Sequence, residues 1–467
     1  MLQVCHIPLA HAERASAGPG PGHAASRTCL QLDKEGGARN IACMTQPAPT
    51  PEAPTPAPTP IQTADLVIAG GGMVGLTLAV ACARAGLSVI VVDAEARATQ
   101  LDEAFDGRAS AVALAACRML KSLGIWPDLE GEAQPILDIR VSDGRAGRRP
   151  SSLFLHFDHG AIGDEPFGHL IENRVLRRAL DRSAARLAGL VQINPATVLR
   201  VEAGPDRTLA HLSDGRVLAA QLVVAADGRN SRLRTAAGIA TRGWSYGQTG
   251  IVATVTHERP HQGLAHELFL PGGPFASLPL TGNRSSLVWT ERHALAEALM
   301  QLPKSAFDDE IRRRFGDHLG HVESTGPRWS WPLALHLADR YVAPRLVLVG
   351  DAAHGIHPIA GQGLNLGLRD VAALAEVLVD GHRLGLEAGD AGLLERYQRW
   401  RRLDNVMLGV VTDGLNRLFS NDLAPVRLAR DLGLAAVERI GPLKRFFMRH
   451  ASGTVGTLPR LLEGRPL

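Results

Sequence analysis

Two short runs, each apolar after a charged first residue, stand out along the chain, because each leads directly into a glycine-rich turn and then into a helical pattern. The first run covers residues 65–69, and apolar positions at three- and four-residue spacing follow it as far as Gly86. The second covers residues 345–350, and Leu364 and Leu368 begin the same spacing behind it. Such runs are typical of buried strands, and the spacing is typical of helices. Both regions are therefore predicted to be strand–turn–helix units of an α/β protein.

Residues 241–335 have a different pattern, with many glycines and prolines between short alternating segments. Alternation of apolar and polar residues predicts half-buried strands. The expected strands are 250–256, 266–270, 275–280 and 285–290. We expect them to form a mixed or antiparallel sheet, inserted between strands of the α/β domain, and we expect the chain beyond residue 385 to be mainly helical.

Residues 1–61 lack the periodicity of a folded domain. Prolines recur at short intervals from Pro47 to Pro60, which favours an extended, polyproline-like linker. We prefer the hypothesis that translation starts at Met44 and that residues 1–43 are not translated. A mitochondrial transit peptide is the alternative, but acidic residues in this segment offset the basic ones.

The composition narrows the class of protein. The formal net charge is +3 and aromatic residues make up 4% of the chain. Nucleic-acid surfaces usually have a basic excess, often with aromatic stacking residues, so no nucleic-acid partner is expected. The five cysteines form no CxxC pair, and Cys82 and Cys117 are expected to be core thiols in a reducing compartment. No secretory signal is visible, and three glycines interrupt the uncharged stretch 66–83, which argues against a membrane span.

The turn after the first apolar run is a dinucleotide fingerprint in its proper context. It reads Gly70-Gly71-Gly72-Met73-Val74-Gly75, and Asp93 ends the next apolar run. The glycines permit a tight turn that brings a pyrophosphate close to the helix N-terminus, where free N–H groups bind anions. Asp93 would accept hydrogen bonds from a ribose and would disfavour a ribose phosphate. FAD or NAD therefore fits better than NADP as the bound dinucleotide.

Other candidate site residues stand at strand ends and helix starts. Asp227 and Gly228 end an apolar run, which suits either a simple turn or a second strand aimed at the nucleotide. Arg108 precedes a helical pattern, and a surface salt bridge is its plainer interpretation. Arg174 opens another helical pattern, for which the plainer interpretation is an N-terminal cap.

The turn after the second apolar run contains several ionisable residues and a proline. Gly350 and Asp351 are followed by His354, His357 and Pro358, a composition that points to a ligand. Asp351 and the two histidines are spaced at threes, which also suggests metal ligands. They lie on a proline-broken loop without a further Cys or His cluster nearby. No metal site is therefore expected, and the histidines are expected to be structural or to line a pocket.

Three signatures occur in a fixed order: the glycine fingerprint, Asp227-Gly228, and Gly350-Asp351 followed by His354 and a PxxGQGxN pattern that starts at Pro358. Together they resemble the single-component FAD-dependent aromatic monooxygenases. Further segments resemble the ubiquinone-biosynthesis hydroxylases of the UbiH/UbiF/VisC type, and the resemblance covers about residues 62–455. These segments are Asp106-Gly107-Arg108, Pro271-Gly272-Gly273-Pro274, Leu278-Pro279-Leu280, Val288-Trp289-Thr290, Trp331-Pro332-Leu333, Phe419-Ser420-Asn421-Asp422 and Lys444-Arg445-Phe446-Phe447-Met448.

The resemblance implies an FAD-binding Rossmann-like domain of the glutathione-reductase type, an inserted sheet domain that covers the substrate, and C-terminal helices. The expected segments are the N-terminal extension and linker (1–61), the first part of the FAD-binding domain with local excursions to the inserted sheet (62–240), the inserted β-sheet domain (241–335), the second part of the FAD-binding domain (336–385) and the helical region (386–467).

The resemblance also implies roles for individual residues. The 70–75 fingerprint would hold the FAD pyrophosphate, and Asp93 would hold the adenosine ribose. Other implied contacts to FAD are made by Arg108, Arg174, Asp227, Gly228, Gly350, Asp351, Pro358, Gly361, Gly363, Leu364 and Asn365. Among these, Asp351 would bind the ribityl chain or pyrophosphate, and Pro358 would lie beside the isoalloxazine ring.

The expected contacts of residues 363–365 with the flavin ring are also favoured by physical chemistry alone. Two-electron reduction of a flavin leaves negative charge near N1 and the C2 carbonyl. The start of the helix at residues 363–365 offers unpaired N–H donors and a positive dipole end to that charge. Gly361 and Gly363 remove side chains that would block a close approach.

The implied reaction is a monooxygenation, in which NADPH or NADH reduces FAD and O₂ then reacts to form a flavin hydroperoxide that hydroxylates an electron-rich ring. The cofactor performs the difficult chemistry. No second fingerprint indicates a separate nicotinamide domain, and no side chain is assigned as an essential acid or base. The implied substrate is a polyprenylated phenol, and other ubiquinone-biosynthesis proteins are candidate partners. Alternatives are a hydroxylase or epoxidase of another aromatic or lipid substrate, or a flavin-containing assembly subunit.

A substrate of this kind lies in a membrane, although no span is visible in the chain. Residues 440–467 combine basic residues with Phe446 and Phe447, which suits peripheral docking on anionic lipid. A solvated helix end is the equally acceptable alternative. The expected location is the cytoplasm, at the inner face of the cytoplasmic membrane.

Overall fold

The computed structural model describes residues 29–32, 38–41, 61–102, 108–148, 151–420 and 424–467, and the chain divides into two units, 1–59 and 60–467. In the first unit, β1 (Cys29–Leu32) pairs with β2 (Ala38–Ile41) in an antiparallel hairpin that the sequence pattern did not indicate. The predicted extended linker and the hypothesis about Met44 concern residues outside the described ranges.

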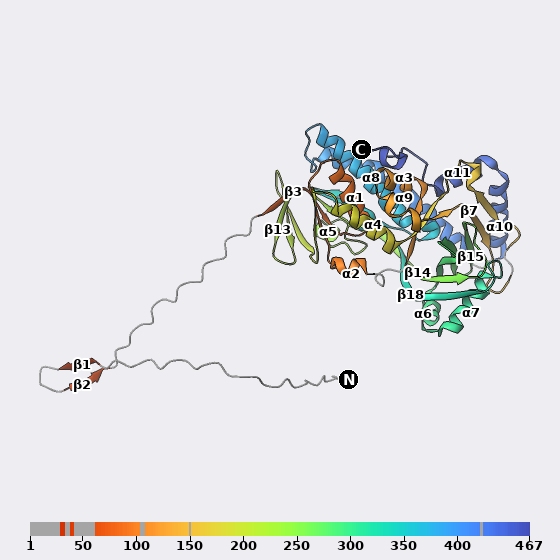
Figure 1. Cartoon of the computed structure of the whole chain (residues 1–467), viewed down its shortest axis with the longest axis horizontal. Helices are drawn as coiled ribbons and strands as arrows, with labels where there is room; N and C mark the ends of the chain where they lie inside the picture. The colour runs from red at the N-terminus through yellow and green to blue at the C-terminus, as the bar shows by residue number, and fades with distance from the viewer. Residues whose placement is uncertain (1–28, 33–37, 42–60, 103–107, 149–150, 421–423) are drawn as a thin grey trace. The chain divides into compact units, whose positions relative to one another are not determined.

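The first apolar run forms the central strand of an eight-stranded sheet, as the absence of alternation predicts. Val67 and Ile68 in this strand are fully buried, and α1 (Met73–Arg84), the helix that follows the strand, packs against the sheet (Figure 1). The strands follow the order β10-β4-β3-β13-β12-β11, and β20 also pairs with β13 and β19. Their bounds are β3 (Gln62–Ala69), β4 (Val89–Val92), β10 (Leu190–Ile193), β11 (Val198–Ala203), β12 (Thr208–Leu212), β13 (Val217–Ala225), β19 (Val342–Ala343) and β20 (Leu346–Leu348).

Parallel pairing brings the ends of three strands to one edge of this sheet. β3 pairs in parallel with β4 and β13, and β13 pairs in parallel with β20. Parallel strands carry their following turns at the same edge, where ligands bind in α/β folds. The glycine fingerprint, Asp227-Gly228 and Gly350-Asp351 therefore lie close together.

A second eight-stranded sheet is formed mainly by the region in which alternation was predicted. Its order is β21-β18-β14-β17-β16-β15-β7-β8, so two strands from the first part of the chain join it at one edge. The bounds are β7 (Asp138–Asp143), β8 (Leu155–Asp158), β14 (Thr241–His257), β15 (Leu264–Leu270), β16 (Gly273–Leu280), β17 (Arg284–Arg292), β18 (Val322–Ala338) and β21 (His354–Gly355). The predicted fold class, an α/β domain with an inserted mixed sheet, is confirmed.

Helices surround both sheets. α6 (His293–Gln301) and α7 (Lys304–Phe315) interrupt the inserted region and were not predicted. Trp289 of β17 and Phe307 of α7 pack together in the core there. A small sheet of β5 (Ala109–Ala113), β6 (Gln134–Ile136) and β9 (Gly168–Glu172) lies beside α3 (Leu114–Ser122) and α4 (Asn173–Ala185). The remaining helices are α1 (Met73–Arg84), α2 (Arg97–Leu101), α5 (Arg232–Ala236), α8 (Gln362–Arg383), α9 (Ala391–Phe419), α10 (Ala424–Arg439) and α11 (Gly441–Ala451).

Two sequence predictions concern the core and the C-terminal region. Cys82 and Cys117 are buried free thiols, and burial raises the pKa of each to about 12, so both are inert core residues. The predicted helical character beyond residue 385 is confirmed by α9, α10 and α11. None of the described helices has the length and apolar composition needed to cross a membrane.

Candidate functional site

A cavity of about 1730 Å³ lies between the ends of the parallel strands and the face of the second sheet. Typical small-molecule pockets measure roughly 300–1,000 Å³, so this one has room for more than one ligand. Most of the predicted site residues line it. They are Gly72, Met73, Val74, Gly75, Arg108, Gly228, Asp351, Pro358, Gly361, Gly363, Leu364 and Asn365.

The other predicted residues lie beside the cavity. Asp93 accepts hydrogen bonds from the Gly71 amide and the Gln100 side chain. Asp227 accepts from backbone amides at the start of α5. Gly70 and Gly350 form the turns behind the lining residues.

Arg174 is not among the residues that line the cavity. Its guanidinium forms an ion pair with Glu172 at 2.8 Å. Arg177 and Asn173 of the same helix line the cavity instead, and Arg177 is only 8% exposed. Asn173, Leu176 and Arg177 share one face of α4 at helical spacing, so periodicity would have favoured Arg177 over Arg174.

The first turn is built by close backbone approach. A Cβ atom at Gly75 would lie 1.9 Å from the Gly70 carbonyl oxygen, so α1 can begin this close to β3 only with glycine at position 75. A Cβ at Gly72 would meet no protein atom within 4 Å. Gly72 lines the cavity, so the space it leaves open is part of the cavity.

The start of α8 repeats this arrangement on the same cavity. Gly361 adopts φ 62° at the N-cap, a left-handed conformation that glycine adopts without strain. A Cβ at Gly363 would meet no protein atom within 4 Å. Neither α1 nor α8 has a side-chain cap or an acidic residue in its first turn. Two helix N-termini therefore present their positive dipole ends to one cavity without a neutralising carboxylate from the helix itself.

These features fit a dinucleotide that also carries an electron-accepting ring. The pyrophosphate suits the N-terminus of α1, as helix N-termini bind phosphate. The N-terminus of α8 suits the negative charge that builds up on a reduced flavin. The residues present therefore fit FAD.

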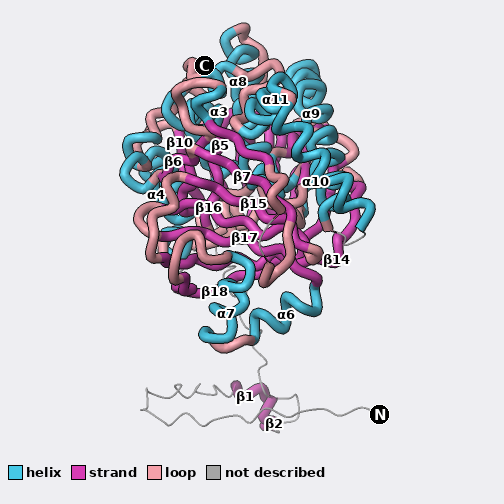
Figure 2. The backbone as a smooth tube through the Cα atoms, turned by 90° about the vertical axis from the view of Figure 1, so that its right-hand side faces the viewer, coloured by secondary structure: helices cyan, strands magenta, loops and turns pink. Residues whose placement is uncertain are grey.

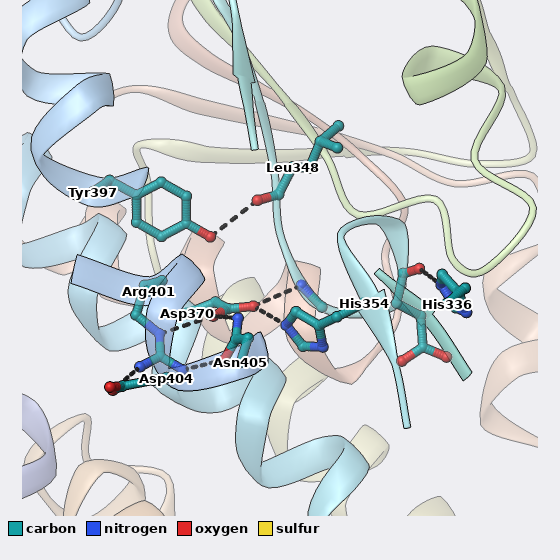
Figure 3. A network of polar contacts seen from close by, with 10 residues as sticks. His336, Leu348, His354, Asp370, Tyr397, Arg401, Asp404 and Asn405 are labelled. Atoms are coloured by element: carbon teal, nitrogen blue, oxygen red, sulfur yellow. Dashed lines mark hydrogen bonds and ion pairs between the residues drawn. The ribbon is translucent and has the colours of Figure 1, made fainter. Parts of the chain in front are cut away.

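A buried polar network holds the turn that carries Asp351 (Figure 3). Asp370 of α8 is fully buried, and its Oδ2 accepts a hydrogen bond from the Gly350 amide at 3.1 Å and lies 2.5 Å from His354 Nε2. Its Oδ1 accepts from Arg401 Nε at 2.9 Å and Asn405 Nδ2 at 3.1 Å. Burial alone would raise the pKa of Asp370, but His354, Arg401 and these hydrogen bonds lower it to about 2. The carboxylate is therefore a permanent anion that joins α8, α9 and the turn.

The histidines of the turn have separate environments. His354 belongs to the Asp370 network. His357 is fully buried against Tyr246, with ring centroids 5.1 Å apart, and burial lowers its pKa to about 4. Within the described residues, no group of three or more His, Cys, Asp or Glu side chains is placed to hold a metal ion.

Asn365 has a structural role that the sequence did not reveal. Its Oδ1 accepts from the Ala113 amide at 2.9 Å, and its Nδ2 donates to the Ala111 carbonyl at 2.8 Å. The side chain therefore ties β5 to the start of α8, and both line the cavity. Arg108 stands immediately before β5, and its guanidinium carbon lies 4.6 Å from the centroid of the Trp331 ring.

Most of the remaining lining of the cavity is apolar. The inserted sheet supplies Ala265, Phe269, Ala276 and Leu278, while α9 supplies Met407, Leu408, Val411 and Leu415. The cavity therefore has a glycine-rich half with helix N-termini and an apolar half between the inserted sheet and the C-terminal helices.

Comparison with known proteins shows which family this chain belongs to. A family model described as an FAD binding domain matches residues 63–406. Ubiquinone hydroxylase UbiL of Rhodospirillum rubrum is 54% identical over 409 residues, which cover 87% of this chain and 94% of that protein. The 3-demethoxyubiquinol 3-hydroxylase of Escherichia coli is 36% identical over 394 residues, which cover 84% of this chain and 99% of that protein.

Solved structures share the fold at lower identity. The p-nitrophenol 4-monooxygenase PnpA from Pseudomonas putida superposes with a TM-score of 0.73 at 18% identity, covering 85% of this chain and 100% of that one. The family model and the two ubiquinone-biosynthesis relatives confirm the family resemblance inferred from the sequence. This chain belongs to the FAD-dependent aromatic monooxygenases, within the ubiquinone-biosynthesis hydroxylase family.

Proposed function

We propose that this chain hydroxylates the aromatic ring of a polyprenylated phenol in ubiquinone biosynthesis, using FAD, NAD(P)H and O₂. The observation that carries the proposal is the two-part cavity, because a dinucleotide cradle opens directly into a large apolar chamber. The names of the relatives in Rhodospirillum rubrum and Escherichia coli support the choice of pathway.

The residues of the chain would position and shield the reaction. FAD, when bound, supplies the redox chemistry that takes reducing equivalents from NAD(P)H and activates O₂. The segment 72–75 would hold the pyrophosphate at the start of α1, and Gly363 and Leu364 would direct amides to the flavin ring. Asp351, Pro358 and Arg108 would line the approach to it. The apolar wall would exclude water from the aromatic ring of the substrate.

The proposal is tested by deleting the gene in an organism without a redundant hydroxylase and analysing quinone precursors by mass spectrometry. Accumulation of a prenylated phenol that lacks one ring hydroxyl, reversed by the intact gene, is the expected result. A normal ubiquinone profile in the deletion strain would refute the pathway assignment. Turnover of a soluble phenol, but not of a prenylated one, would favour the alternative substrate class.

We also propose that the protein binds peripherally to the cytoplasmic face of the cytoplasmic membrane. Exposed apolar side chains gather on the C-terminal helices, which lie on one side of the molecule (Figure 2). Met407 and Val411 of α9 and Phe446 and Phe447 of α11 are exposed and also line the cavity. The apolar chamber thus continues onto the surface, where a long prenyl chain would remain in lipid.

Charge on these helices supports contact with anionic lipid. The exposed basic residues described on α9, α10 and α11 are Arg396, Arg399, Arg402, Arg417, Arg439, Arg445 and Arg449, whereas Glu395 and Asp404 are the exposed acidic ones described there. Basic residues near an apolar face strengthen binding to anionic membranes by about 1 kcal/mol each. The segment 440–467, expected from the sequence to dock, carries only part of this surface, because much of the apolar face belongs to α9.

Vesicle flotation tests whether the exposed apolar and basic surface of the C-terminal helices binds membranes. Leu403, Val410 and Leu443 are exposed and lie outside the cavity lining, so their combined substitution by serine should lower binding to phosphatidylglycerol-containing vesicles at least tenfold. Serine at Leu384 and Leu386, which are exposed elsewhere, is the matched control and should leave binding unchanged. Equal binding of both variants, or no binding by the intact protein, would contradict membrane docking.

A further inference from the structure

Glu267 places a carboxyl group in the apolar wall of the cavity. It stands on β15 between Ala265 and Phe269, and the three side chains share the cavity face because strand residues two apart point the same way. Its neighbours across the sheet are Ala276 of β16 and Val141 of β7, and both also line the cavity. The carboxyl is therefore surrounded by apolar side chains on its own strand and on both adjacent strands.

The carboxyl group of Glu267 has no hydrogen-bond or ion-pair partner among the residues that the structure describes. Burial raises its pKa from 4.5 to about 7, with no contribution from a neighbouring charge. An unpaired carboxylate in apolar surroundings is unfavourable. Glu267 is partly exposed, and because it lines the cavity, a polar group of a ligand bound there could pair with it.

We propose that Glu267 is a catalytic residue that accepts a hydrogen bond from the phenolic hydroxyl of the substrate and takes up its proton. This inference rests on the proposed function, since it assigns the role to a phenol in the same cavity. A phenolate ring is more electron-rich than a phenol, so proton uptake by Glu267 prepares the ring carbon to receive oxygen.

The proton balance is simple. The phenol O–H bond breaks, its electron pair stays on oxygen, and an O–H bond forms on the Glu267 carboxyl. After oxygen has been added, the ring oxygen takes this proton back. The hydroxylated carbon loses its hydrogen as a proton, which leaves in water together with the second oxygen atom of O₂. Glu267 returns to its ionised form, and a general base of this kind contributes typically 10²–10⁴-fold to a rate.

The test compares a short-chain prenylated phenol with its methyl ether, which lacks the acidic proton. Binding to the FAD-loaded protein is followed by the change in the flavin absorption spectrum. The intact protein should bind the phenol at least tenfold more tightly than the ether. Glu267→Gln should reduce this preference below threefold and slow hydroxylation about 100-fold, and Glu267→Asp should recover part of both. Glu323→Gln, an exposed carboxylate on the same sheet, is the matched control and should behave as the intact protein.

Different failures have different meanings. Unchanged preference and unchanged rate in Glu267→Gln, with the phenol still bound and hydroxylated, would overturn the role of Glu267 alone. Failure of the intact protein to bind or hydroxylate any prenylated phenol would overturn the proposed function, and this inference with it.

Discussion

The unpartnered carboxyl of Glu267 should make the protein less stable than it would be with an uncharged side chain. Its pKa is raised by burial from 4.5 to about 7, and one pKa unit corresponds to about 1.4 kcal/mol. Ionising this group in the folded protein therefore costs about 3 kcal/mol relative to the unfolded chain. The cost is absent below pH 4.5, grows as the pH rises towards 7, and is complete above pH 7.

Replacement of Glu267 by glutamine removes this cost. The free energy of unfolding of Glu267→Gln should exceed that of the intact protein by about 3 kcal/mol at pH 8 and should match it at pH 4.5. Urea unfolding of the FAD-free proteins, followed by circular dichroism across this pH range, measures the difference. Glu323→Gln should show no such gain. A Glu267→Gln variant that is no more stable at pH 8 would mean that the carboxyl is well solvated or paired, and would refute the reasoning.

Further predictions concern the FAD cradle. Asp370→Asn removes the buried anion beside His354 and Arg401 and leaves Arg401 paired with the exposed Asp404. It should cost about 3 kcal/mol of unfolding free energy and weaken FAD binding at least tenfold. Asp380→Asn on the same helix, half-exposed beside Arg460, should cost less than about 1 kcal/mol. Because the pKa of Asp370 is lowered from 3.8 to about 2, it should supply about 2 kcal/mol of stability above pH 4 that is lost between pH 4 and 2 in acid-unfolding curves. Gly363→Ala should leave the FAD-free protein equally stable, or more stable by under about 1 kcal/mol, yet weaken FAD binding at least tenfold by fluorescence titration. Unchanged FAD affinity in both Asp370→Asn and Gly363→Ala would contradict the assigned cradle.

The sequence could predict which turns meet at the cavity, because each turn directly adjoins a buried strand or a helix start. Gly72, Gly75, Asp351 and Gly363 stand in turns that directly follow buried strands or open helices, and parallel pairing then brings those turns together. Local pattern is sufficient in such cases, since strand ends and helix starts can be read from short segments.

The remaining site residues depend on contacts between distant segments. Asp370 and Arg401 lie 31 positions apart, and nothing in either helical pattern indicates that their charged groups meet inside the protein. Alternation places Glu267 on one face of a strand, but both faces of the inserted sheet are partly covered. The pattern therefore could not show that this face borders a cavity.

The central claim is hydroxylation of a prenylated phenol with oxygen from O₂, and isotope labelling tests it most directly. Purified FAD-loaded protein, with NAD(P)H and a prenylated phenol in vesicles, would be allowed to react under isotopically labelled dioxygen, and the product would be analysed by mass spectrometry. We predict a product with one additional ring hydroxyl that carries one labelled oxygen atom, formed in proportion to the NAD(P)H consumed. Oxidation of NAD(P)H that yields only hydrogen peroxide, with the phenol unchanged under conditions where it binds, would contradict the account.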